Sequence, residues 1–233
     1  MDTLAQVGTT VGQVDEILNA EEQQHSTTPV TFAGHDIVLD HVSFDYHDDK
    51  EILHDVSLSI PAGRMTALVG PSGSGKTTLT NALVRQFPAS AVLRTDDFYL
   101  PPAQRAHGWE QTPCANMDLA RLRDEALRPA YAGQPVQYRA YSCRKGAYQP
   151  AQELAAQPLV ILEGSYSHHP LLTGYETLRV FVTCSKDEQV RRLQEREGER
   201  YANFAARWIP LEEGYFAKYQ IAENADFVVD TTL

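Results

Sequence analysis

The segment Gly70-Pro-Ser-Gly-Ser-Gly-Lys-Thr77 constrains the fold of this chain more than any other feature. It fits the pattern GxxxxGK[ST], it follows the short apolar run 65–69, and it precedes a segment with leucines at helical spacing. This order is typical of a phosphate-binding loop (P-loop) between a buried strand and a helix, where backbone N–H groups and the positive end of the helix bind phosphate oxygens. The motif therefore predicts a nucleotide-binding α/β fold.

The same segment supplies candidate nucleotide contacts. Lys76 is expected to reach the β- and γ-phosphates, and the Thr77 hydroxyl is expected to bind Mg²⁺. The cofactors predicted are thus ATP and Mg²⁺. The full set of candidate ATP contacts in the loop is Gly70, Pro71, Ser72, Gly73, Ser74, Gly75, Lys76, Thr77 and Thr78.

Beyond the loop, short apolar runs alternate with segments of helical periodicity. The pattern predicts strands at 65–69, 91–93, 159–162, 179–182 and 227–229, and helices at 76–87, 117–130, 186–198 and 209–220. Strands that alternate with helices are typical of a parallel sheet with crossover helices. We expect a P-loop NTPase fold of the α/β class, in which helices flank a five-stranded parallel sheet.

The part of the chain before the loop has a different pattern. Residues 10–22 have the spacing of a short amphipathic helix, and 23–30 read as a linker. The runs 35–46 and 51–60 alternate apolar and polar residues around a turn at 47–50, which predicts an antiparallel β-hairpin. We expect an N-terminal helix and linker at 1–33, the hairpin at 34–63 and a P-loop domain at 64–233.

Charge supports a boundary near residue 64. Residues 1–63 contain 12 Asp or Glu and one Lys, whereas 64–233 contain 19 acidic and 19 basic residues. The net charge of −11 argues against a nucleic-acid partner. The chain has no apolar run of about 20 residues, no signal-peptide pattern and no CxxC spacing, so we expect a cytoplasmic protein without a membrane span. An oligomer, or a partner bound through residues 1–30, remains open.

The segment IVLDHVSFDYHDDKEILHDVSLSIPAGRMTALVGPSGSGKTTL resembles the opening of an ABC-transporter nucleotide-binding domain, and EILNAEEQQ resembles the linker that precedes such domains in exporters. Together the similarity covers about residues 10–80. In that family the aromatic residue matching Tyr46 stacks on adenine, which makes Tyr46 a candidate base platform. The alternative is a tyrosine that packs on the end of the hairpin. Past Leu79 the sequence contains no LSGGQ signature and no strand that ends in Asp-Glu.

From about residue 70 onward the chain resembles uridine kinases and related nucleoside kinases, through TDDFYLP (95–101), QYRAYSCR (137–144), VILEGSYS (160–167) and RWIPLEEGYF (207–216). The resemblance implies that Asp96 is the catalytic base and that Asp97 and Glu163 help to hold Mg²⁺. Asp96 and Glu163 are expected at the carboxyl edge of the sheet, beside the P-loop. The alternatives are a turn formed by Asp96 and Asp97 and a helix-capping role for Glu163.

The same resemblance implies a nucleoside pocket and an arginine lid. The implied pocket residues are Tyr99, Glu110, Tyr138, Tyr141 and Arg144, although WEQTP and Ser142-Cys143 depart from the family pattern. Arg192, Arg196 and Arg200 recur at every fourth position and are expected on one helix face, with Arg192 and Arg196 as candidate catalytic cations. Surface packing of the tyrosines and a solvated, ion-paired arginine face are the alternatives.

These observations lead to one main hypothesis and one alternative. The main hypothesis is an ATP- and Mg²⁺-dependent kinase that transfers the γ-phosphate to a hydroxyl of a small molecule, such as the 5′-OH of uridine. The alternative is a nucleotide-binding regulatory module, or an ABC-type ATP-binding protein without transport activity.

Overall fold

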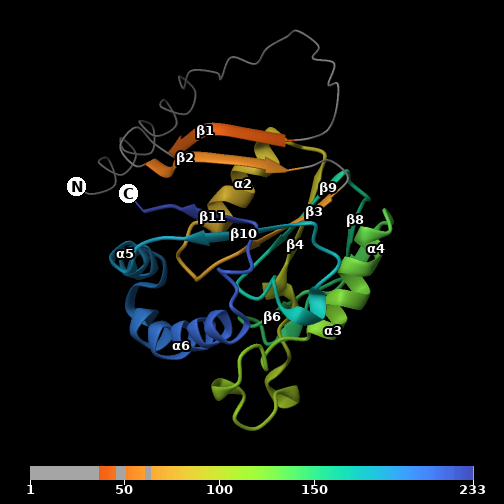
Figure 1. Ribbon diagram of the computed structural model, residues 1–233. Helices are drawn as coiled ribbons and strands as arrows, with labels where there is room; N and C mark the ends of the chain where they lie inside the picture. The colour runs from red at the N-terminus through yellow and green to blue at the C-terminus, as the bar shows by residue number, and fades with distance from the viewer. Residues whose placement is uncertain (1–36, 46–50, 61–63, 233) are drawn as a thin grey trace, which may run out of the picture. The chain divides into compact units, whose positions relative to one another are not determined.

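The computed structural model describes residues 37–45, 51–60 and 64–232, which belong to one compact unit, residues 34–233. A five-stranded parallel sheet forms its centre, with the strand order β11-β10-β3-β9-β4 (Figure 1). These strands are β3 (Arg64–Val69), β4 (Ser90–Arg94), β9 (Leu159–Glu163), β10 (Leu178–Thr183) and β11 (Phe227–Asp230). Each predicted strand is present, to within one residue at either end.

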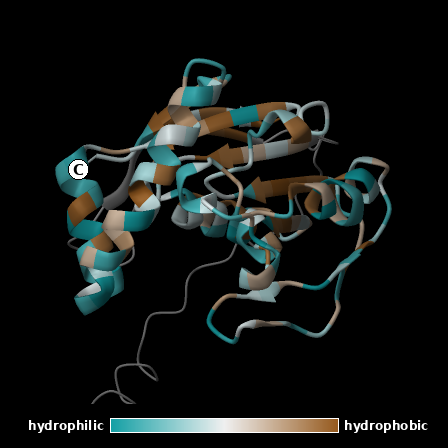
Figure 2. Cartoon of the chain, turned by 90° about the horizontal axis from the view of Figure 1, so that it is seen from below, coloured by the Kyte–Doolittle hydropathy of each residue, from teal (hydrophilic) through white to brown (hydrophobic). Residues whose placement is uncertain are grey.

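Alternate residues of the central strand β3 belong to two hydrophobic clusters. Met65, Ala67 and Val69 belong to one cluster, together with Phe98. Leu68 belongs to the other, together with residues of the helix that follows the P-loop. Because successive side chains of a strand point to opposite faces, both faces of the sheet are covered. Figure 2 shows the strands as a mainly hydrophobic centre with more polar helices around it.

Helices lie on both sides of the sheet (Figure 1). Helix α2 (Lys76–Gln86) follows the P-loop, and α5 (Lys186–Glu197) follows β10. The predicted helix at 117–130 is present as α3 (Leu119–Arg121), a π-helical segment (Leu122–Leu127) and α4 (Arg128–Tyr131). The prediction of a P-loop NTPase fold is therefore confirmed.

Helix α6 (Tyr201–Tyr219) begins eight residues before its predicted start. Pro210 lies inside this helix and has no N–H for the usual backbone bond, so the sequence there resembles a helix start. Leu211 and Tyr215, which follow Pro210, are buried and keep the second part of the helix packed against the protein.

The hairpin is confirmed for the described residues. Strands β1 (Ile37–Asp45) and β2 (Glu51–Ile60) pair antiparallel and form a separate two-stranded sheet. Val56, Leu58 and Ile60 are buried in the same cluster as Leu68 and α2. The predicted turn at 47–50, Tyr46 and the helix and linker at 1–33 lie outside the described residues.

Four short strands between α4 and β9 were not predicted. Strand β5 (Val136–Tyr138) pairs with β8 (Gln152–Leu154), and β6 (Tyr141–Ser142) pairs with β7 (Ala147–Tyr148). Runs of two or three residues are too short to show a period, which explains why the sequence does not reveal them.

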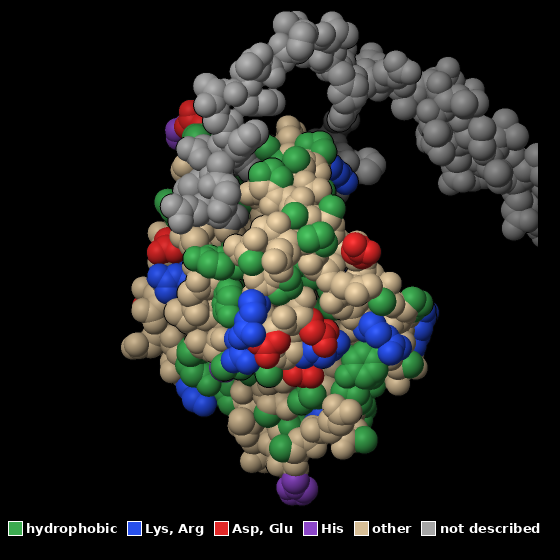
Figure 3. All heavy atoms as spheres, turned by 90° about the vertical axis from the view of Figure 1, so that its right-hand side faces the viewer, with side chains coloured by type: hydrophobic (Ala, Val, Ile, Leu, Met, Phe, Trp, Pro, Cys, Tyr) green, Lys and Arg blue, Asp and Glu red, His purple; other side chains and the backbone are tan. Residues whose placement is uncertain are grey.

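Charges of both signs lie close together on the face that carries α3 and α4 (Figure 3). Arg121 pairs with Asp118 and Glu125, and Asp124 pairs with Arg128. Acidic and basic residues are equal in number over residues 64–233, and on this surface they also pair locally. Among the described residues, no helix combines the length and the apolar character needed to cross a membrane.

Candidate nucleotide-binding site

The P-loop connects the end of β3 to the first turn of α2. Gly75 is the residue before α2 and has a φ of 87°, a left-handed conformation that favours glycine. The Ser74 N–H donates to the Pro71 carbonyl at 3.0 Å, which closes the turn of the loop. The first N–H groups of α2 have no partner within the helix, and these are the groups that would bind phosphate.

Lys76 and Thr77 begin α2 and differ in their surroundings. The Lys76 ammonium donates to the Pro71 carbonyl at 3.3 Å across the loop. Thr77 is exposed, and its hydroxyl donates to Glu163 Oε1 at 2.8 Å. Glu163 ends β9 and is 6% exposed, and Arg94 approaches its other oxygen at 3.5 Å. The structure thus brings two of the three predicted metal ligands together.

Gly164 allows β9 to end close to the neighbouring strand. A Cβ atom at this position would lie 1.8 Å from Oγ1 of Thr95, and the residue has a φ of 145°. Thr95 is fully buried and cannot swing away. Any larger residue would displace Glu163 or the acidic turn that follows β4, so Gly164 sets the spacing of the two.

The acidic turn Thr95–Phe98 follows β4 and carries Asp96 and Asp97. Asp96 is exposed at the surface, although the protein atoms packed around its carboxyl group reduce its hydration and raise its pKa. The nearby ammonium of Lys76 opposes this shift, and Glu163 adds to it. The Asp96 carboxylate therefore binds a proton more readily than an ordinary aspartate does.

The hydrogen-bond partner of the Asp97 carboxylate is neither Thr77 nor Glu163. Its Oδ2 accepts from the hydroxyl of Tyr138 at 2.8 Å, and the Tyr138 ring stacks on Phe98 at 4.9 Å. Burial raises the pKa of the Tyr138 hydroxyl, so this group remains a donor. One predicted metal ligand and one predicted pocket tyrosine are therefore partners of each other.

Arg192 binds the backbone of the P-loop. Its guanidinium donates to the Gly73 carbonyl at 3.3 Å and to the carbonyl of Thr231 at 2.6 Å. The Thr231 hydroxyl in turn donates to the Ser74 carbonyl at 2.8 Å. Glu188 accepts from Arg191 and Arg192, and these cations lower its pKa to about 2. In this structure Arg192 therefore binds backbone carbonyls of the P-loop and of the segment after β11.

The three arginines do not share one helix face. Arg196 pairs with Glu197 at 2.9 Å and lies over the ring of Phe204, whereas α5 ends at Glu197, before Arg200. Gly198 ends the helix with a φ of 56°. The expectation of one arginine face is therefore wrong, because the chain turns between the second and the third arginine.

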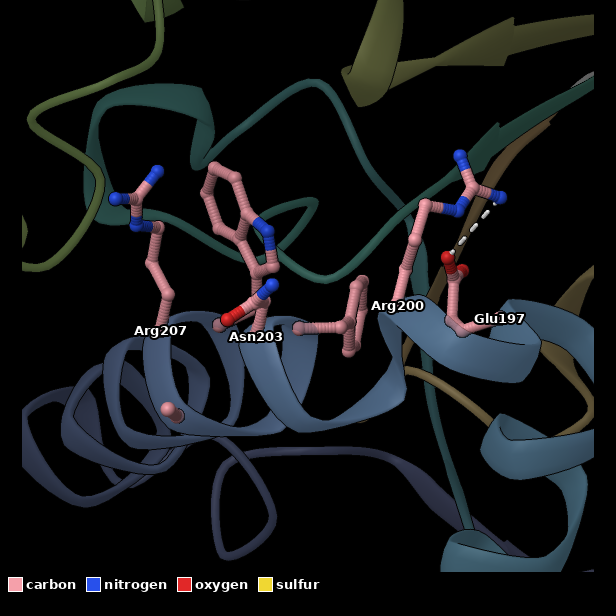
Figure 4. Close-up of a pocket in the computed structure, with 7 residues that line it drawn as sticks. Glu197, Arg200, Asn203 and Arg207 are labelled. Carbon is pink, nitrogen blue, oxygen red and sulfur yellow. Dashed lines mark ion pairs between the residues drawn. The ribbon is translucent and has the colours of Figure 1, made fainter.

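A cavity of about 680 Å³ lies along α6 (Figure 4). Arg200, Asn203 and Arg207 line it, and Arg200 pairs with Glu197 at 3.6 Å. Trp208 also lines the cavity and contacts the rings of Tyr99 and Trp109 at 6.1 and 6.0 Å. The predicted pocket residue Tyr99 thus joins an aromatic cluster beside this cavity.

The remaining predicted residues are dispersed. Tyr141 is buried edge-on against Tyr148, with the ring centres 5.3 Å apart. Glu110 is exposed in the short 3-10 helix Trp109–Gln111, Arg144 is exposed in a turn, and Thr78 is half-buried in the first turn of α2. Within the described residues, the predicted nucleoside pocket does not form a single cluster of contacts.

Glu212 contacts the P-loop and was not predicted as a site residue. It lies in α6, is 6% exposed, and accepts from the Ser72 N–H at 2.8 Å. A signal was present in the sequence, since Glu212 is three residues before Tyr215 on the apolar side of the helix. A carboxylate at a core-facing position needs donors, and the P-loop supplies them.

The site residues fit Mg²⁺ held together with phosphate. Within 37–45, 51–60 and 64–232, no three His, Cys, Asp or Glu side chains converge on one point. The Thr77 hydroxyl and the Glu163 carboxylate are oxygen ligands, which Mg²⁺ prefers, and Mg²⁺ in nucleotide sites is usually bound by one or two protein oxygens plus phosphates and water.

Comparison with known sequences identifies transport proteins. Residues 53–99 match the family model described as ABC transporter. The chain is 36% identical over 141 residues to an ATP-dependent lipid A-core flippase of Burkholderia pseudomallei, which is 58% of this chain and 23% of that protein. It is 42% identical over 81 residues to the mitochondrial iron-sulfur clusters transporter ATM1 of Chaetomium globosum, which is 34% of this chain and 13% of that protein. The chain therefore spans less than a quarter of the length of these relatives.

Comparison with solved structures shows the fold alone. The structure of a possible uridine kinase from Bacillus stearothermophilus superimposes with a TM-score of 0.58 and 21% identity, covering 73% of this chain and 91% of that chain. This likeness supports the P-loop α/β fold and carries no argument about the substrate.

The sequence comparisons correct two predictions. The identification of residues 70–233 with uridine kinases is wrong, because the matching family model and the curated relatives are ABC transporter proteins. Transfer of the γ-phosphate to a nucleoside hydroxyl is wrong for the same reason. What stands is a P-loop NTPase fold whose sequence similarity, from β2 to the acidic turn, is to ABC transporters.

Proposed function

We propose that this chain is an ABC-type module that binds Mg·ATP and hydrolyses the bond to its terminal phosphate. The matched residues 53–99 extend from β2 through the P-loop and α2 to the turn with Asp96. They therefore include the elements that would hold the triphosphate. The relatives are described as an ATP-dependent flippase and as a transporter, and this supports ATP as the nucleotide.

The observation that carries the proposal is the 2.8 Å hydrogen bond between Thr77 and Glu163 at the mouth of the P-loop. It joins the first turn of α2 to the carboxyl end of β9, where parallel strands place their ligands. Thr77 and Glu163 would hold Mg²⁺, and Lys76 would bind the outer phosphates. When bound, Mg²⁺ neutralises charge on the phosphates.

Hydrolysis needs a water molecule oriented toward the terminal phosphorus. We assign this task to Asp96, because the turn that carries it follows β4 directly, where Arg94 is paired in register with Glu163 at the end of β9. The water oxygen would bond to phosphorus as the bond from phosphorus to the bridging oxygen breaks. Asp96 would accept the proton of the water.

The proposal ends at ATP hydrolysis. The sequence contains no LSGGQ, the signature with which two ABC cassettes complete each other's ATP sites. We therefore propose that this module does not complete a second cassette. A cytoplasmic location and a partner bound through residues 1–30 remain predictions.

The test is phosphate release from Mg·ATP without any added acceptor, combined with calorimetric ATP binding. We expect Lys76→Ala to lose ATP binding and Asp96→Asn to bind ATP but to hydrolyse it at least about 100-fold more slowly. Lys145→Ala is the matched control, because Lys145 is exposed and its ammonium group bonds only to Gln149 among the contacts described.

Two results would contradict the proposal. Binding without phosphate release by the unmodified chain would favour a nucleotide-binding regulatory module. Phosphate transfer that depends on an added hydroxyl compound would show that water is not the acceptor.

A further inference from the structure

Glu212 is a buried carboxylate that accepts three hydrogen bonds at the edge of the P-loop. Its Oε2 accepts from the Ser72 N–H at 2.8 Å. Its Oε1 accepts from the hydroxyls of Ser72 and Ser165, both at 2.7 Å. With 6% of its surface exposed, the carboxylate depends on these donors to replace water.

These bonds join the two loops that would hold Mg·ATP. Ser72 lies in the P-loop, directly before the N–H groups that would bind phosphate. Ser165 lies two residues after Glu163, in the loop that ends β9. A single side chain of α6 therefore fixes the phosphate side of the site relative to the metal side.

The neighbours of Glu212 leave it little freedom to move. Leu211 and Tyr215 are buried on the same helix, and the Tyr215 ring packs edge-on against Tyr166 with ring centres 5.1 Å apart. From α5, Gln189 donates to the Ser72 carbonyl at 2.9 Å. Ser72 is thus held at its N–H, its hydroxyl and its carbonyl by two different helices.

We propose that Glu212 is a positioning residue for Mg·ATP, an inference that rests on the proposed function. It keeps the P-loop at a fixed spacing from Glu163, so that phosphate and Mg²⁺ bind at once. If Glu212 acted only through its charge, it would lower the affinity for Mg·ATP, because a negative charge beside a triphosphate repels it. Removal of the side chain therefore weakens binding if Glu212 positions the loop and tightens binding if Glu212 only repels.

The experiment measures the affinity for Mg·ATP by calorimetry, and the KM and kcat of phosphate release, in the full chain. Glu212→Ala should weaken binding about tenfold or more, which corresponds to the loss of one hydrogen bond to a charged group. Glu212→Gln retains an oxygen acceptor for the Ser72 N–H and should restore most of the affinity. The control is Glu213→Ala, whose partner Lys186 is exposed, and it should stay within about twofold.

A second variant guards against loss of folding. Ser165→Ala removes only the bond between Glu212 and the loop after β9, and it should raise KM severalfold. Its melting temperature should stay close to that of the unmodified chain, which shows that the variant is folded. In the double variant with Glu212→Ala it should add no further loss, because both changes break the same link. Affinities of Glu212→Ala and Ser165→Ala equal to or above that of the unmodified chain would overturn the proposal. Failure of the unmodified chain to bind Mg·ATP would instead reject the proposed function.

Discussion

His168 is a buried imidazole in the segment after β9, and its Nε2 contacts the Ala67 carbonyl oxygen at 3.2 Å. Burial lowers its pKa from 6.5 to about 4, because the charged ring would lose its hydration. In the unfolded chain the ring takes up a proton near pH 6.5, whereas in the folded chain it does so only near pH 4. The stability associated with neutral His168 is therefore complete above pH 6.5 and is lost as the pH falls to about 4.

This linkage gives a prediction for single side chains. The free energy of unfolding of the unmodified chain should fall between pH 7 and pH 4. In His168→Gln this fall should be smaller by roughly 2–3 kcal/mol. Chemical denaturation at several pH values measures the difference. The exposed His107→Gln should keep the unmodified slope. The pKa of Glu176, raised by burial to about 7, acts in the opposite direction, but it is common to all three proteins and cancels. An unchanged slope in His168→Gln would contradict the assignment.

Two arginines of α5, one turn apart, have different structural roles. The Arg192 side chain is 14% exposed and bonds to Glu188, Gly73 and Thr231, whereas the Arg196 side chain is 51% exposed. Arg192→Ala leaves Glu188, itself 11% exposed, without one of its donors and frees two carbonyls. It should cost about 2–3 kcal/mol, and Arg196→Ala less than about 1 kcal/mol. Urea denaturation of the two variants checks this, and equal losses would show that Arg192 does not anchor the loop.

At the level of elements, periodicity predicts what is long and regular. The five strands of the parallel sheet and α2 and α5 follow from apolar runs and leucine spacing. Helix α6 is located only in part, because Pro210 resembles a helix start. The Thr77–Glu163 contact follows from the rule that parallel strands end at one edge of the sheet. The contact of Glu212 with Ser72 joins residues 140 apart in sequence, and no local pattern gives the rotation of α6 that creates it.

At the level of the molecule, the hairpin is part of the same core as the P-loop domain. Leu58 of β2 is 3% exposed and lies in the cluster with Leu68 and Leu79. Leu58→Ala should therefore destabilise the P-loop domain itself, by about 2–5 kcal/mol. The two tryptophans, Trp109 and Trp208, lie outside the hairpin, so their fluorescence reports unfolding of the domain. Val38→Ala, at a position 67% exposed, is the control. A fluorescence transition that is unmoved in Leu58→Ala would show that the hairpin unfolds independently.

The fold of the whole molecule also explains why kinase activity was the wrong prediction. A P-loop fold places carboxylates such as Asp96 and Glu163 at one sheet edge whether water or a hydroxyl compound accepts the phosphate. Short motifs such as TDDFYLP describe that edge and do not specify the acceptor. The longer sequence matches, which include the hairpin strand β2, point to ABC transporters instead.

The hydrogen bond from the Thr231 hydroxyl to the Ser74 carbonyl joins residues 157 positions apart in the sequence. On a ribosome, the segment from β3 to α2 is made long before β11 and Thr231, so the Ser74 carbonyl lacks this partner until Thr231 has been made. Contacts this distant in sequence form late in folding. A nascent chain should therefore acquire a rigid phosphate loop only after β11 has emerged and docked beside β10, and ribosome-bound intermediates should bind nucleotide poorly until then.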